Sequence, residues 1–295
     1  MNDDLPVSEI PRVPVDAEAV RGFTREREHF HVAFNLLREV VQWAVLLGSA
    51  VTGTVRDWTL EEAVFGGQFV RLSKLLRAFL EQAKDNRAEL AWVSSRLITE
   101  CVVNVSYLLA NRSEDLLKSY LHQSLQHERD LLKTIRTNIK GRSGQELPIE
   151  TRMIRSIERT FRNSEIRLDD LPDKKVHHWG GKTLRQKAEA LGMLTVYQTA
   201  IAGSSRNVHG SWYDLLQHHL EVVPPGRFRP RFEETRVRPQ LLYALAVLTL
   251  EAYDGYIQHL GTSKTEGLHK RIVELDERVR LANDLHEQFL VERGS

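Results

Sequence analysis

The sequence contains a single cysteine, Cys101, among its 295 residues. One thiol excludes an internal disulfide and a cysteine-rich metal site. This cysteine usage favours a reducing compartment, so we expect a cytoplasmic protein. The first residues, MNDDLPVSEIPRVPVD, have neither the basic nor the apolar region of a signal peptide.

Long apolar runs and a charge excess of one sign are also missing. The longest apolar run, VVQWAVLLGSAVTGTV at 40–55, is interrupted by Gln42, Ser49 and two threonines. A bilayer needs about 20 predominantly apolar residues, so we expect a core helix and no membrane span. Lys and Arg number 41 against 40 Asp and Glu. No global field therefore draws the protein to nucleic acid.

The alternating pattern of β-strands is absent as well, whereas nearly every segment has helical periodicity. We therefore predict an all-α fold, a multi-helix bundle with no sheet. The expected helices span 17–50, 58–85, 87–110, 113–140, 149–164, 184–191, 193–220, 237–261 and 265–292.

Proline, glycine and charged residues between these helices suggest a domain organisation. The predicted parts are a flexible leader (1–16), an N-terminal helix (17–57), a core helical domain (58–220), a basic Pro/Arg linker (221–236) and a C-terminal helical hairpin (237–295).

The last helix carries a coiled-coil-like seam, in which steps of four and three residues alternate. The seam consists of Leu268, Ile272, Leu275, Val279, Ala282, His286 and Phe289. Because most amphipathic helices pack within their own chain, we favour docking on the protein's own core. A homodimer or an oligomeric scaffold built through this helix stays the alternative.

The segment 94–111 is apolar almost all round, which indicates a central helix. It nevertheless has polar residues on one face, namely Arg96, Glu100, Asn104 and Tyr107. Burying an unpaired charge costs several kcal/mol, so a polar segment should face this helix. SSRNVHGSW at 204–212 can supply it, with Ser205 and His209 one turn apart and Trp212 closing over the cluster. We expect His209 to be a satisfied interior histidine, with a catalytic or ligand-binding role as the alternative.

Two stretches resemble a known family. SSRLITECVVNVSYLL and HHWGGKTLRQKAEALGMLTVYQTAIAGSSRNVHGSW together resemble the all-helical domain of unknown function 5677 (DUF5677). With flanking helices the resemblance covers roughly residues 58–220. It implies a helical bundle and no established activity. It also implies a set of signature positions, which are Arg96, Glu100, Trp179, Lys182, Tyr197, Ser205 and His209.

The V-H-G sequence at the end of the second stretch is also similar to the end of the motif in HEPN-type helical ribonucleases, which reads Arg-polar-x-x-x-His. Here Ser204 stands five residues before His209, and Arg206 only three. This resemblance implies an RNase or toxin, for example in defence or stress. His209 would act as acid or base, and Arg96 or Arg206 would hold a phosphate beside Glu100.

Phosphate-loop and metal motifs are weak. GGKT at 180–183 lacks the glycine of a phosphate-binding loop at position 176, and Thr183 with Gln186 forms a capping box instead. The adjacent pairs His177–His178 and His218–His219 point apart on a helix, and no H-E-x-x-H is present. We predict no metal site and no cofactor.

Three basic stretches suggest an anionic partner. Between 129 and 162, nine Lys or Arg stand against four Asp or Glu, and a helical hairpin could present them to a phosphate backbone. A third stretch interleaves arginines with Phe228 and Phe232, which could stack on unpaired bases. The candidate anion-binding residues are Arg129, Lys133, Arg136, Lys140, Arg152, Arg155, Arg159, Arg162, Arg227, Arg229 and Arg231. We predict a module that binds nucleic acid, RNA ahead of DNA, or an acidic protein. Catalysis is left open.

Overall fold

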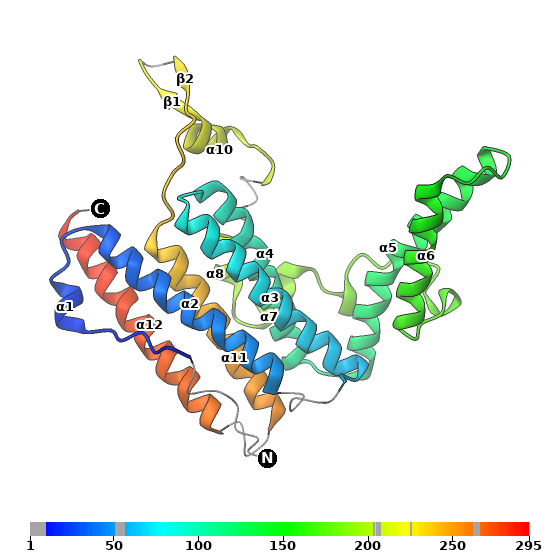
Figure 1. Ribbon diagram of the computed structural model, residues 1–295, viewed down its shortest axis with the longest axis horizontal. Helices are drawn as coiled ribbons and strands as arrows, with labels where there is room; N and C mark the ends of the chain where they lie inside the picture. The colour runs from blue at the N-terminus through cyan, green and yellow to red at the C-terminus, as the bar shows by residue number, and fades with distance from the viewer. Residues whose placement is uncertain are drawn as a thin grey trace. The chain divides into compact units, whose positions relative to one another are not determined.

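The computed structural model describes residues 10–50, 57–202, 204, 208–224, 226–261 and 266–294. The predicted all-α fold is confirmed, because helices dominate and strands form only a small hairpin within these ranges (Figure 1). No helix in this part of the chain is long and apolar enough to cross a membrane. The chain forms two compact units. The first joins residues up to Ala110 with those from Ala188 onward, and the second is Asn111–Lys187.

The first unit is a layered bundle of long helices from both ends of the chain. Its helices are α1 (Ala17–Arg21), α2 (Glu26–Ala50), α3 (Leu60–Lys84), α4 (Ala88–Ala110), α11 (Pro239–Leu260) and α12 (Glu266–Glu292). Helix α2 packs against α3, α11 and α12, while α4 packs against α3 and α11. The first unit therefore extends across the predicted boundaries at 57 and 220. The apolar faces of the helices from the two ends of the chain form one core together with α3 and α4.

The predicted helix 193–220 is wrong as one continuous element. The described residues there form α8 (Leu194–Val196), the π-helix η5 (Tyr197–Ala202), α10 (Trp212–Asp214) and a second π-helix η6 (Leu215–His219). Next come the antiparallel strands β1 (Leu220–Val222) and β2 (Phe228–Pro230), so the prediction of no sheet is also wrong. Pro224 cannot continue a ladder, and Gly226 reverses the chain with a φ of 81°.

The second unit is built around the hairpin of α5 (Glu114–Gly141) and α6 (Pro148–Asn163). Short turns η3 (Leu168–Asp170) and η4 (Trp179–Gly181) follow, and α7 (Leu184–Ala190) begins here. The core is apolar and consists of Leu125, Leu132, Ile135, Ile157, Phe161 and Leu171. The capping box is confirmed, since Gln186 N donates to Thr183 Oγ1 (3.2 Å) and Thr183 N donates to Gln186 Oε1 (2.9 Å).

The seam of α12 docks on the protein's own core, as predicted. Leu268, Ile272, Leu275, Val279 and Ala282 are buried, and α12 packs against α11 and α2. His286, which interrupts the apolar seam, is also buried, and its ring lies 4.8 Å from that of His29 on α2. The imidazole therefore fills a core position against another aromatic ring.

A buried ion pair joins α2, α12 and the segment before α1. Arg278 donates to both carboxylate oxygens of Glu39, at 2.9 and 2.7 Å. Val13 N donates to the same carboxylate (2.8 Å), and Arg278 also donates to Val13 O. The prediction of a flexible leader is therefore wrong at Val13 and at Asp16, which caps α1. Residues 1–9 lie outside the described residues.

Removal of one member of the Glu39–Arg278 pair should destabilise the first unit strongly. We expect Glu39→Gln to lower the free energy of unfolding by about 3 kcal/mol, because it leaves a buried guanidinium without its counter-charge. The matched control is Glu251→Gln, since Glu251 pairs with Arg280 where both side chains are half exposed. It should cost less than about 1 kcal/mol. Urea unfolding checks both, and equal losses would contradict the assignment.

The buried histidines should make stability depend on pH. Burial, followed by the nearby His286, lowers the pKa of His29 to about 4, and burial also lowers the pKa of His286. The unfolded chain therefore binds more protons than the folded chain once the pH falls below about 6.5.

We expect His29 to make the free energy of unfolding fall between about pH 6.5 and pH 4, by up to about 3 kcal/mol, and His286 to add a loss of the same sign below about pH 6.5. Unfolding of the double variant His29→Gln/His286→Gln should show a flatter profile over the same range. Exposed His31 provides the control, and His31→Gln should keep the wild-type slope. A double variant as steep as wild type would exclude this origin.

Candidate functional site

Helix α4 lies in the core, as its apolar sequence predicts. Tyr107 is buried, whereas Arg96, Glu100 and Asn104 are half-buried. In the part of the chain that the structure describes, Arg96 and Glu100 do not form an ion pair. The Arg96 Nη1 atom is buried and has no hydrogen-bond partner there. The expected Arg96–Glu100 couple is therefore not formed.

The thiol of Cys101, on another face of α4, is fully buried. It donates to Gln68 O (3.4 Å) and Gln68 Oε1 (3.2 Å) on α3. Burial raises the pKa of this thiol to about 11, so it stays protonated at neutral pH and acts as a packing residue.

The contact with α4 comes from the π-helix η5, which lies just before 204–212, the segment predicted to face it. Half-buried Tyr197 stands at the start of η5. Ser204 is buried, and its hydroxyl donates to Ala200 O and Ile201 O. This hydroxyl therefore satisfies the backbone of its own helical turn. Ser205 and Arg206 lie outside the described residues.

His209 is exposed, so the prediction that it is an interior histidine is wrong. The helix expected over 193–220 does not continue through this residue, because the chain turns at Gly210 with a φ of 57°. Ser211 then caps a new helix, accepting a hydrogen bond from Asp214 N (3.3 Å). Trp212 is 56% exposed and does not close over a buried cluster.

Trp179 and Lys182, two further signature positions, belong to the second unit. Trp179 is buried, and its ring meets that of Tyr120 on α5 edge to face, with centroids 5.4 Å apart. The Lys187 ammonium lies 3.0 Å from the centroid of the same indole ring. Lys182 is exposed. Trp179 therefore anchors η4 and the start of α7 to α5.

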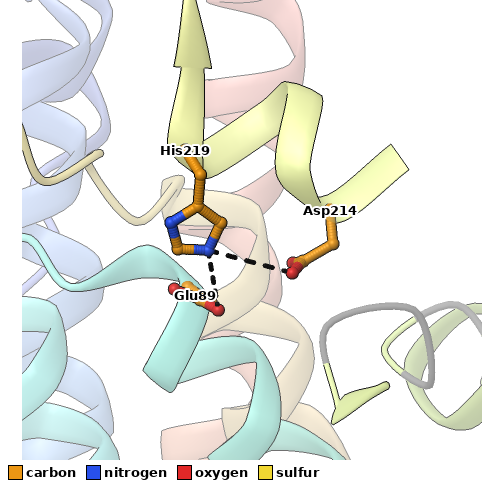
Figure 2. A group of neighbouring side chains, drawn as sticks. All are labelled: Glu89, Asp214 and His219. Atoms are coloured by element: carbon orange, nitrogen blue, oxygen red, sulfur yellow. Dashed lines mark hydrogen bonds and ion pairs between the residues drawn. The ribbon is translucent and has the colours of Figure 1, made fainter. Parts of the chain in front are cut away.

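The structure instead assembles a group that the sequence did not single out: Glu89, Asp214 and His219. Figure 2 shows the imidazole of His219 directed at both carboxylates. His219 Nε2 lies 3.2 Å from Glu89 Oε1 and 3.9 Å from Asp214 Oδ2. One ligand atom from each residue lies within 4.8 Å of the others. Asp214 is buried, whereas Glu89 and His219 are partly exposed. We call these residues the Glu–Asp–His triad.

The wide π-helical turn explains how the triad forms. Asp214 ends α10 and His219 ends η6, five residues later, which matches the i→i+5 hydrogen bonding of a π-helix. Glu89 comes from the first turn of α4. The two adjacent histidines do point apart, as predicted, because His218 Nδ1 lies 3.2 Å from Thr235 Oγ1 while His219 faces Glu89. A search for α-helical spacing misses a five-residue interval.

A pocket of about 1470 Å³ lies in the first unit. Residues from α2, α3, α4, η5, α10, η6 and the segment that leads into α11 line it. Besides two histidines, the lining contains five cations and four Phe, Tyr or Trp rings, which are Arg27, Lys84, Arg231, Arg236, Arg238, Phe30, Phe34, Trp92 and Tyr213. Arg238 is paired with Glu26 at 3.1 Å. Such a lining suits an anionic molecule with a flat ring.

The basic rows of the α5–α6 hairpin are exposed, with one exception. Arg129 is buried, and its guanidinium donates to Pro172 O (2.7 Å) and Asp130 Oδ1 (3.3 Å). The prediction that Arg129 binds an external anion is therefore wrong, because its guanidinium donates hydrogen bonds within the chain, including one to the backbone of the loop after α6. The other members are exposed, namely Lys133, Arg136, Lys140, Arg152, Arg155, Arg159 and Arg162.

The third basic stretch forms the β1–β2 hairpin of the first unit. Arg227 and Arg229 are exposed, whereas Arg231 is half-buried and donates to Gln217 O (2.8 Å). Phe228 is 43% exposed and meets the Trp212 ring edge to face at 5.3 Å. Phe232 is also exposed. Aromatic and guanidinium groups therefore share this surface, as the sequence predicts.

The exposure of His209 can be tested through stability. We expect His209→Ala to change the free energy of unfolding by less than about 0.5 kcal/mol, as for most surface substitutions. The control is His286→Ala, which removes a buried ring and should cost about 2 kcal/mol or more. Thermal or urea unfolding measures both. A large loss in His209→Ala would contradict the exposed position.

Comparison with known proteins identifies one relationship. A family model described as a family of unknown function (DUF5677) matches residues 62–224, more than half of the chain. No curated protein and no solved structure matches the sequence. The match includes α4, the α5–α6 hairpin and all three triad residues. It does not bear on the resemblance to HEPN-type domains, which stays a prediction. The chain belongs to the DUF5677 family.

Proposed function

We propose that this protein is a nucleic-acid-binding module that binds single-stranded RNA. The observation that carries the proposal is the concentration of exposed cations on the α5–α6 hairpin, in a chain with a net charge of only +1. A protein that neutralises phosphates with Lys and Arg gains affinity through the release of condensed counterions.

The amphipathic character of α6 keeps its cations directed outward. Ile157 and Phe161 are buried in the hairpin core. Arg152, Arg155, Arg159 and Arg162 recur on α6 at steps of three and four residues and are exposed. The spacing supports a continuous row along one side of the helix, as a phosphate backbone requires.

The β1–β2 hairpin supports a single-stranded ligand. Exposed Phe228 in β2 and exposed Phe232 just after it can stack on unpaired bases, and Arg227 and Arg229 can contact phosphates or stack as well. Duplex DNA offers no such unstacked bases, whereas RNA presents them in loops and ends. This chemistry favours RNA over DNA and over an acidic protein.

The binding test uses charge reversal. We expect Arg155→Glu/Arg159→Glu to weaken binding of a fluorescent 20-nucleotide RNA by at least tenfold, and to reduce the slope of log affinity against log salt by about one to two. The control is Lys270→Glu/Arg271→Glu, which makes the same charge change at exposed positions on α12. It should retain most of the affinity. Fluorescence anisotropy at several salt concentrations measures all three proteins.

Other outcomes would replace the proposal. Equal loss in both charge-reversal variants would indicate an unspecific charge effect. No binding by wild type, together with capture of an acidic protein, would favour the protein partner. Cleavage of the RNA that disappears in His209→Ala would favour the HEPN-like RNase.

A further inference from the structure

We infer that the Glu–Asp–His triad binds a divalent first-row transition-metal ion. This site is separate from the α5–α6 cations that carry the proposed RNA binding, although it adjoins the β1–β2 hairpin. Its ligands are one imidazole nitrogen and two carboxylate oxygens, from residues that lie in two distant parts of the sequence.

One pair of ligand atoms has the spacing that a common metal ion requires, and the others lie within 4.8 Å. Zn²⁺ bonds to nitrogen and oxygen at about 2.0–2.2 Å, so two ligands on one ion lie about 3.0–3.5 Å apart. His219 Nε2 is 3.2 Å from Glu89 Oε1 and 3.9 Å from Asp214 Oδ2. Small side-chain rotations would therefore bring the three atoms around one ion.

Electrostatics also favours a cation at this point. The side chain of Asp214 is 2% exposed and that of Glu89 is 30% exposed, so two carboxylates converge at a point that water reaches from one side only. A dication between them offsets both charges. Since Asp214 is fixed at the end of α10 and Glu89 at the start of α4, the same ion would join two separate elements.

The ligand set indicates the class of metal. Mg²⁺ and Ca²⁺ take oxygen ligands, whereas an imidazole suits zinc and its neighbours. The His219 side chain is 44% exposed, which leaves the outer side of the site open to solvent. Three protein ligands with an open position are typical of zinc sites that also hold a water molecule.

A competing explanation needs no metal, because a protonated His219 could itself bridge the two carboxylates. The neighbouring histidine separates the two explanations. His218 adjoins His219 in sequence but lies against Thr235, so it offers a matched control for non-specific binding to imidazole.

The experiment titrates Zn²⁺ into the chelator-treated full chain by calorimetry, with Mg²⁺ as the contrasting ion. We expect one strong Zn²⁺ site and at least tenfold weaker binding of Mg²⁺. His219→Ala and Glu89→Gln should each weaken Zn²⁺ binding at least tenfold, whereas His218→Ala should leave it within about twofold. Saturating Zn²⁺ should raise the melting temperature of wild type and His218→Ala but not of His219→Ala.

Three results would overturn the inference. These are absence of Zn²⁺ binding by wild type, unchanged binding in both triad variants, and equal loss in His218→Ala. Glu89→Gln removes a charge from a partly exposed residue, so it tests the site even where His219→Ala folds poorly. RNA affinity measured on the same variants keeps the two proposals distinct, because the α5–α6 cations are untouched.

Discussion

The burial of α4 is the constraint on which the first unit depends. This helix is apolar on almost its whole circumference, so a single neighbour cannot cover it. Helix α3 packs on it from the preceding segment, α11 from near the end of the chain, and η5 from the segment between them. Both ends of the chain therefore fold into one unit, while Asn111–Lys187 forms another from an uninterrupted segment.

The buried polar groups in this core are stabilised in two different ways. Glu39 and Arg278 form a bidentate pair that also holds the backbone of Val13, so their charges are compensated. His29 and His286 instead remain neutral and pack as aromatic rings, because burial lowers their pKa values. The Glu–Asp–His triad differs from both arrangements, because two carboxylates and an imidazole converge at a partly exposed position.

The region from η5 to β2 is where the fold departs from regular helices. Two π-helices and short α-helical turns replace the long helix expected from periodicity, and a short β-hairpin follows them. π-helical turns are rare and occur frequently at functional sites. Here one of them aligns Asp214 with His219, and the following hairpin exposes aromatic and arginine side chains. The proposed metal site and one of the two proposed RNA-contacting surfaces therefore arise from the same irregular stretch, while the other surface is a regular amphipathic hairpin.

The sequence by itself determined most of the long helices, their amphipathic faces, the docking seam of α12 and all but one member of the exposed basic rows. Those features follow from residues three or four positions apart, whose spacing is a local property. Only the tertiary structure decided that His209 is exposed, that Arg129 donates a hydrogen bond to Pro172 O, and that Glu89 lies beside His219. The last pair is separated by 130 residues. Such contacts depend on how distant apolar faces pack and where the chain turns. Neither can be predicted from local periodicity.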